Sequence, residues 1–129
     1  MTVGEGIRVV RAGELRPGQP TAGMTREEAI SRGSIWAGLV RTEPGMQSGW
    51  HHHGAHETAI YVLSGRMRME SGPDGSEMVE GGAGDFIHVP QGAVHRESNP
   101  SSEQAVAVIV RSGTGEVVVN VDGPQSSPG

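Results

Sequence analysis

The chain has 129 residues, six histidines, no cysteine and a formal net charge of -5 at pH 7. This length suits one packed domain. The absence of cysteine excludes disulfides and thiolate ligands, so a transition-metal site would have to use histidine, carboxylate or water. The acidic balance, with two tryptophans, one tyrosine and one phenylalanine in the whole chain, argues against nucleic acid as a partner.

The sequence offers no segment of membrane-spanning length. The longest strongly apolar run, residues 105–110, is far below the roughly 20 residues that cross a bilayer. The first residues also lack the charged-then-apolar pattern of a secretory signal. We therefore expect a cytoplasmic protein that has a small molecule, rather than a membrane, as its partner.

Short apolar runs separated by glycine-rich turns favour an all-β fold. Hairpin loops are predicted at residues 71–75, 81–84 and 112–115, where glycine, proline and aspartate supply turn geometry. Many short strands with such turns are typical of a sandwich, jelly roll or barrel. The predicted strands are residues 7–11, 34–42, 58–63, 66–70, 78–80, 85–89, 94–97, 104–111 and 116–121.

The two ends of the chain look different from this central part. Thr25 followed by Glu28 has the spacing of a helix-capping box, so a short helix is predicted within an otherwise irregular N-terminal arm, residues 1–33. The barrel would then occupy residues 34–121. Residues 122–129 have the composition of a disordered tail.

The six histidines fall in two segments of the chain. On a strand, alternate side chains share a face, so His51 and His53 would point together, as would His95 and Glu97. If a barrel brings the two faces together, three imidazoles and one carboxylate form a site suited to Fe, Mn, Ni, Zn or Cu, with positions left open for water or substrate. The six are His51, His52, His53, His56, His88 and His95.

The spacing in both segments resembles the two motifs of the cupin superfamily. Residues 84–99 have the form G-x5-P-x-G-x2-H-x3-N, which matches the second cupin motif in full. Residues 45–65 are similar to the first motif, G-x5-H-x-H-x3,4-E-x6-G. The resemblance implies a cupin double-stranded β-helix, or jelly-roll, barrel and the binding of one divalent transition metal ion, with His51, His53 and His95 as ligands.

The carboxylate of the first motif is where the chain departs from the pattern. The spacing H-x-H-x3-E, counted forward from the histidines, places the carboxylate at Glu57. The spacing E-x6-G, counted back from Gly65, places it at Thr58. The segment also resembles the H-x-H-x3-E-T-x2-Y pattern of the pirin branch, in which an H-x-E in the second motif supplies the ligand. That correspondence selects Glu97, so Glu57 and Glu97 both remain candidate metal ligands.

The remaining histidines allow two interpretations each. His56 would be a ligand if a bulge shifts the strand after Gly54, and would otherwise form a hydrogen bond at the rim. His88 shares a face with Phe86 and is either a pocket residue or a polar neighbour of the strand.

These observations favour a metal-dependent enzyme that acts on a small organic oxyanion or enolisable substrate. A mixed histidine and carboxylate set suits redox-capable iron, so a dioxygenase-like reaction is favoured over an isomerase or hydrolase. Glu57 is the candidate catalytic residue, as a proton shuttle beside the metal. The alternative is a non-catalytic cupin that binds or senses a small ligand, and the resemblance also implies a homodimer.

Overall fold

The structure is a computed structural model that describes residues 6–19, 23–114 and 118–124. A single 3-10 turn precedes the strands, and two antiparallel sheets follow. The elements are η1 (Ala12–Glu14), β1 (Arg16–Pro17), β2 (Met24–Arg32), β3 (Ile35–Thr42), β4 (His51–His52), β5 (Glu57–Ser64), β6 (Arg66–Ser71), β7 (Glu77–Gly82), β8 (Phe86–Val89), β9 (His95–Ser98), β10 (Ala105–Ser112) and β11 (Val119–Asn120).

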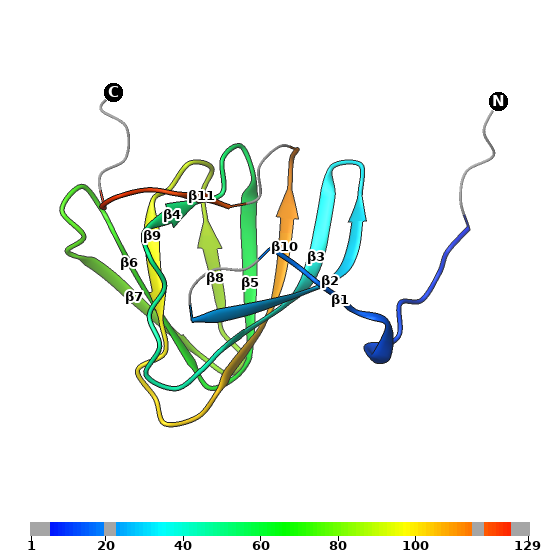
Figure 1. Cartoon of the computed structure of the whole chain (residues 1–129), viewed down its shortest axis with the longest axis horizontal. Helices are drawn as coiled ribbons and strands as arrows, with labels where there is room; N and C mark the ends of the chain where they lie inside the picture. Colours follow the sequence, from blue (N-terminus) through cyan, green and yellow to red (C-terminus); the bar gives the residue numbers. More distant parts are fainter. Residues whose placement is uncertain (1–5, 20–22, 115–117, 125–129) are drawn as a thin grey trace.

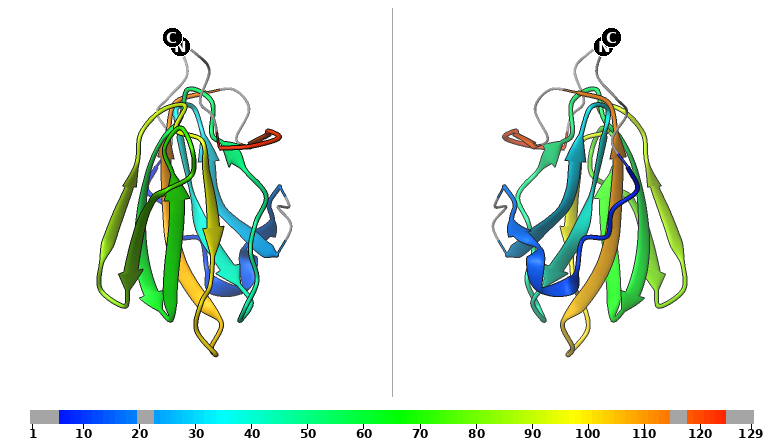
Figure 2. Two further views of the ribbon diagram at one scale, coloured as in Figure 1. Left: turned by 90° about the vertical axis from the view of Figure 1, so that its left-hand side faces the viewer. Right: turned by 90° about the vertical axis from the view of Figure 1, so that its right-hand side faces the viewer.

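The two sheets face each other in a jelly-roll arrangement (Figures 1 and 2). The six-stranded sheet has the order β1-β2-β3-β10-β5-β8, and the five-stranded sheet has the order β11-β4-β9-β6-β7. Neighbours in each sheet are mostly distant in sequence, such as β3 and β10 or β6 and β9. The all-β jelly-roll barrel predicted from the sequence is confirmed.

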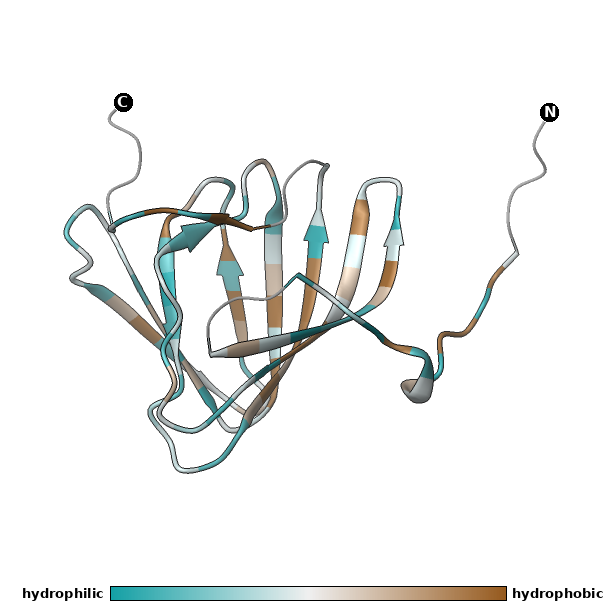
Figure 3. Cartoon of the chain, in the orientation of Figure 1, coloured by the Kyte–Doolittle hydropathy of each residue, from teal (hydrophilic) through white to brown (hydrophobic). Residues whose placement is uncertain are grey.

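Alternation along the strands places apolar side chains between the sheets. In β10 every second residue is buried, from Ala105 through Ala107 and Ile109 to Arg111. This period of two is what a half-buried strand requires. Figure 3 shows apolar segments along β3, β5 and β10, whereas β4 and β9 are hydrophilic. The core is therefore apolar over most of the barrel and polar where β4 and β9 contribute.

The short helix predicted around Thr25 and Glu28 is wrong. These residues lie in β2, which pairs with β3 from Met24↔Thr42 to Arg32↔Ile35. The capping-box spacing is a local signal, and pairing along a whole strand outweighs it because the strand also buries Met24 and Arg26. Residues 24–32 thus belong to the six-stranded sheet rather than to an irregular arm.

Two further strand predictions differ from the structure. Residues 7–11 form no strand, and Ile7 is fully exposed, because no neighbouring strand pairs with them. Of the predicted strand 116–121, residues 116 and 117 lie outside the described residues, and β11 is confined to Val119–Asn120. Residues 125–129 of the predicted tail also lie outside the described residues.

The glycine that closes the first motif has a steric role. Gly65 connects β5 to β6 with a φ of 77°, a conformation that L-residues with a Cβ rarely adopt. A Cβ at this position would lie 2.8 Å from Cα of Ala105. The close approach of β10 to this turn therefore requires glycine.

Within the described part of the chain, no helix has the length and apolar character needed to cross a bilayer. The cytoplasmic location stays a prediction.

Candidate metal centre

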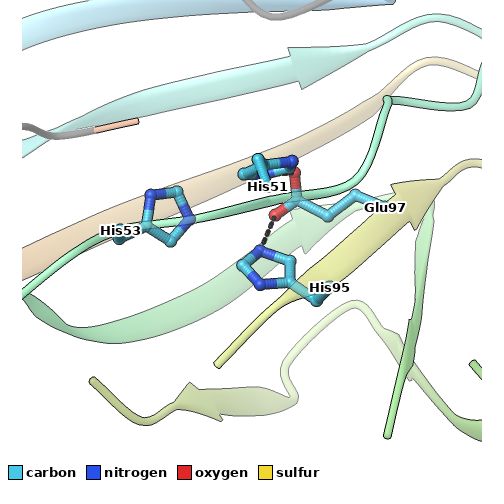
Figure 4. Close-up of side chains that lie close together, drawn as sticks. All are labelled: His51, His53, His95 and Glu97. Carbon is cyan, nitrogen blue, oxygen red and sulfur yellow. Dashed lines mark ion pairs between the residues drawn. The ribbon is translucent and has the colours of Figure 1, made fainter. Parts of the chain in front are cut away.

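Four buried side chains converge between the two sheets, as Figure 4 shows. They are His51, His53, His95 and Glu97, and their potential ligand atoms all lie within 4.8 Å of one another. The ring centroids of the three histidines are 4.5 to 5.1 Å apart. All four residues are at most 3% exposed, so the group is withdrawn from bulk water.

Strand pairing explains why the two motifs meet. His51 of β4 pairs directly with His95 of β9, and the backbone N–H of Gly92 donates to the carbonyl of Gly54 at 2.9 Å. The first contact aligns the strands, and the second connects the loops that lie beside them. The predicted grouping of His51, His53 and His95 is therefore present in the structure.

Backbone carbonyls orient two of the imidazoles. Nδ1 of His51 lies 3.0 Å from the carbonyl of Gly49, and Nδ1 of His95 lies 2.9 Å from that of Ala93. A carbonyl oxygen can only accept, so in the neutral ring each Nδ1 carries the proton and each Nε2 presents a lone pair. This is the tautomer that a metal-binding histidine needs.

Ser48 connects a ligand histidine to the ligand carboxylate. Its hydroxyl accepts from the backbone N–H of Glu97 at 2.9 Å and donates to the carbonyl of Gly49 at 2.9 Å. That same carbonyl accepts the Nδ1 proton of His51. One serine thus contacts both the carbonyl that orients the His51 ring and the backbone of Glu97.

The electrostatics of the group keep Glu97 ionised. Burial by itself would raise the pKa of this carboxyl, but the adjacent imidazoles of His95 and His51 and the charge of Arg26 hold it well below its usual range. Burial also lowers the pKa of His51, so this imidazole is neutral and available at neutral pH. Burial would lower the pKa of His95 as well, but Glu97 outweighs it and leaves that pKa raised.

The residues fit a divalent transition metal ion. Nε2 of His51, Nε2 of His95 and Oε2 of Glu97 are buried without a hydrogen-bond partner, a costly arrangement unless something binds there. Nε2 of His51 lies 3.6 Å from Oε2 of Glu97, and Nε2 of His95 lies 3.7 Å from Oε1. Two ligand atoms on one ion, each about 2.1 Å from it, are roughly 3.4 Å apart at a tetrahedral angle.

Glu57 does not belong to this group. It begins β5 on the outward-facing side, and Oε2 lies 3.4 Å from Nε2 of His88, with both side chains more than half exposed. The next residue, Thr58, is the buried one, as the count back from Gly65 indicates. The prediction of Glu57 as a metal ligand and catalytic residue does not fit the structure, because its parity on β5 points it to solvent, and Glu97 supplies the carboxylate.

His56 and His88 also lie outside the four-residue group. His56 is buried, and its Nδ1 donates to the carbonyl of Ser112 at 3.0 Å, which agrees with hydrogen bonding rather than ligation. His88 lies at the surface beside Glu57. Neither is among the converging ligand atoms.

Two buried arginines, Arg26 and Arg111, each 2% exposed, were not predicted from the sequence. Arg26 was hidden by the wrong helix prediction for its segment. The burial of Arg111 could have been predicted, since it follows Ile109 at the two-residue period of β10. Both are close enough to Glu97 for their charges to interact.

A family profile described as cupin domain matches residues 38–111. The chain belongs to the cupin family. This confirms the resemblance that the two motifs indicated, and the matched range contains all four residues of the group. A search of curated protein sequences gives no match.

Several solved structures superpose on this chain. The polyketide cyclase RemF from Streptomyces resistomycificus has a TM-score of 0.73 at 22% identity, over 90% of this chain and 86% of that one. A variant of the oxalate decarboxylase from Bacillus subtilis has a TM-score of 0.72 at 26% identity, over 86% of this chain and 31% of that one. This cupin thus spans about a third of the decarboxylase chain.

A third match is a conserved Klebsiella pneumoniae protein with a double-stranded β-helix domain. Its TM-score is 0.71 at 19% identity, over 91% of this chain and 99% of that one. The match thus extends over nearly the whole of that protein.

Replacing Ser48 by Ala should weaken metal binding by about 10- to 100-fold, because this serine positions ligands without contacting the ion. Competition with a chelating dye measures the effect. Ser76→Ala, in the exposed β6–β7 loop, is the matched control and should bind like the wild type. An unchanged affinity in Ser48→Ala would show that the carbonyl contacts suffice without it.

Metal affinity should fall as the pH is lowered, beginning above pH 6.5. The pKa of His95 is raised above its usual value of 6.5, so below that raised value the metal-free protein holds a proton that the ion must displace. Calorimetric titration with Zn²⁺ at a series of pH values measures this. Affinity that stays constant down to pH 6 would contradict the proton competition.

Proposed function

We propose that this cupin is a metal-dependent enzyme that converts a small organic substrate inside the barrel, with dioxygen as the co-substrate and iron as the favoured ion. The main support is that the three imidazoles and Glu97 converge, and that Nε2 of His51 and of His95 is buried there without a hydrogen-bond partner. Four protein ligands leave coordination positions open on an iron ion, and a bound Fe(II) supplies redox chemistry toward dioxygen there.

The walls beside the group set the size of the substrate. A cavity of about 150 Å³ reaches His95 between β6, β8 and the turn before β9. Since one water occupies about 30 Å³ in the liquid, this volume suits a molecule of few non-hydrogen atoms. The apolar residues that line it are Met69, Val79, Ile87, Val89, Pro90 and Ala93.

Glu97 supplies the carboxylate chemistry of the proposal. It is ionised and 3% exposed, so its position is rigid and its charge is little screened by water. A carboxylate oxygen that is not bound to the ion can accept a proton from a substrate held next to it. With Glu57 on the outer surface, Glu97 takes over the proton-shuttle role in this proposal.

A reaction without oxidation is the second candidate, and the comparisons favour it. The similar structures include a polyketide cyclase and an oxalate decarboxylase, and a metal ion in this group could act as a Lewis acid on an enolisable substrate. A cupin that binds or senses a ligand without turnover is the third. Substrate turnover with or without oxygen uptake separates all three.

The double variant His51→Ala with His53→Ala should lose stoichiometric metal and all turnover, since it removes two of the four ligands. Elemental analysis measures the metal, and an oxygen electrode measures turnover of iron-loaded protein with small phenols, diketones and keto acids. His52→Ala, whose side chain faces away from the group, is the control and should retain its metal. Wild-type metal content in the double variant would refute the site.

We also propose that two copies pair through the outer face of the six-stranded sheet. Leu63, Phe86 and Val110 are exposed on this face by 48%, 76% and 38%, and the ring of Phe86 packs on Tyr61 at 4.7 Å. Such apolar exposure on neighbouring strands favours burial against a second copy.

Phe86→Glu should shift the protein from dimer to monomer, because it places a charge in the proposed apolar contact. Light scattering coupled to size exclusion measures the mass. Val79→Glu, exposed on the other sheet at 57%, should leave the dimer intact. A monomeric wild type would rule out the pairing.

A further inference from the structure

Arg111 ends the buried face of β10 in the interior of the barrel. It is 2% exposed, and its strand register places it between Trp36 of β3 and Thr58 of β5, both of which are also buried. The guanidinium carbon lies 5.1 Å from the centre of the Trp36 ring. The side chain therefore points inward and is held against an aromatic wall.

The guanidinium lacks the partner that a buried arginine needs. Nε and Nη1 of Arg111 are buried without a hydrogen-bond partner, which leaves three N–H donors unused. Glu97 is the single buried carboxylate among the described residues, and its oxygens lie next to Nε2 of His51 and His95. Burial and the nearby Arg26 lower the pKa of Arg111 to about 10, against the raising effect of Glu97, so it stays charged at neutral pH.

Thr58 explains why no internal carboxylate reaches Arg111. Residue 58 is the carboxylate position of the first cupin motif when counted back from Gly65, and it is the direct cross-strand neighbour of Arg111. Cross-strand neighbours on one face have Cβ atoms about 5 Å apart, close enough for an ion pair. In this chain the position carries a hydroxyl, and Oγ1 of Thr58 is itself buried without a hydrogen-bond partner.

The charge balance of the barrel interior also favours a bound anion. The buried ionic side chains among the described residues, apart from histidine, are Arg26, Arg111 and Glu97, which leaves one excess positive charge. A divalent ion at the metal centre would add two more. Uncompensated buried charge is costly, so an anion in the barrel would be strongly favoured.

Arg111 and the metal centre belong to the same end of the barrel. In Figure 1 the C-terminal end of β10, where Arg111 lies, is near the end of the sheets that carries β4. The charge of Arg111 also acts on His95, whose pKa it lowers against the effect of Glu97.

We propose that Arg111, with Thr58 beside it, binds the carboxylate of a small organic acid whose second oxygen faces the His51–His53–His95–Glu97 group. This names the substrate class and rests on the proposed function for its reaction, although the anion site itself needs no turnover. A 2-oxo acid has both features. Arg111 acts here as a binding residue.

Trp36 offers a direct reporter of the anion. The chain has two tryptophans, and Trp50 lies under Arg96 on the other sheet, 4.4 Å from the guanidinium carbon to the ring centre. In a Trp50→Phe background the fluorescence comes from Trp36, which stacks on Arg111. Titration of the zinc-loaded and metal-free proteins with pyruvate should give a saturable change, whereas the uncharged pyruvamide should give none.

Arg111→Gln in that background should weaken pyruvate binding by at least about tenfold, the usual cost of losing a charged hydrogen-bond partner. Arg111→Lys should weaken it less, because it keeps the charge but fewer donors. Thr58→Glu should also weaken it, by giving Arg111 an internal carboxylate. Arg41→Gln, on the outward face of the neighbouring strand β3, is the matched control and should bind like the background.

Metal content and circular dichroism of each variant separate this proposal from the metal proposal. Retained metal and fold with lost pyruvate binding in Arg111→Gln support the anion site. Arg111-dependent binding in protein that takes up no metal would support the anion site and refute the metal-dependent function. Equal affinity in Arg111→Gln and its background, or no saturable response to pyruvate in the background protein, would overturn the anion site.

Discussion

The antiparallel pairing of His51 with His95 is the contact on which the site depends. It joins β4, a strand of two residues, to β9 in the centre of the five-stranded sheet. Because side chains directly opposite each other on one face lie close together, this pairing alone brings the two motifs within ligand distance. Gly92 and Gly54 then lock the neighbouring loops by a backbone hydrogen bond.

Burial around this pairing gives the group its chemistry. Few polar groups survive in a core of β-sandwich type unless they are partnered, and here backbone carbonyls satisfy one nitrogen of His51 and of His95 while the other stays unpaired. The dry surroundings strengthen every charge interaction. Glu97 stays ionised in the middle of the group for that reason, with cationic and imidazole neighbours on several sides.

The polar interior extends beyond the four ligand-type residues. Arg111 and Thr58 face the same space from the six-stranded sheet, and each keeps buried polar atoms unpaired. The five-stranded sheet thus supplies the atoms that would hold an ion, while the six-stranded sheet supplies donors that would hold an anion. A cupin barrel provides two opposed walls, and in this chain the two walls carry complementary chemistry.

The sequence was sufficient to predict the fold class, the turns and the histidine trio, because strand parity and loop glycines are local properties of the chain. The sequence could not decide between Glu57 and Glu97, because the spacing from the histidines and the spacing from Gly65 disagreed. Only the orientation of β5 in the barrel shows that Thr58 points inward and Glu57 outward. The sequence also predicted a helix at Thr25 from a local capping pattern. That pattern is outweighed by pairing with β3, which becomes apparent only in the three-dimensional structure. The tertiary structure decided these points, and revealed Arg26 and Arg111, because burial depends on which strands become neighbours.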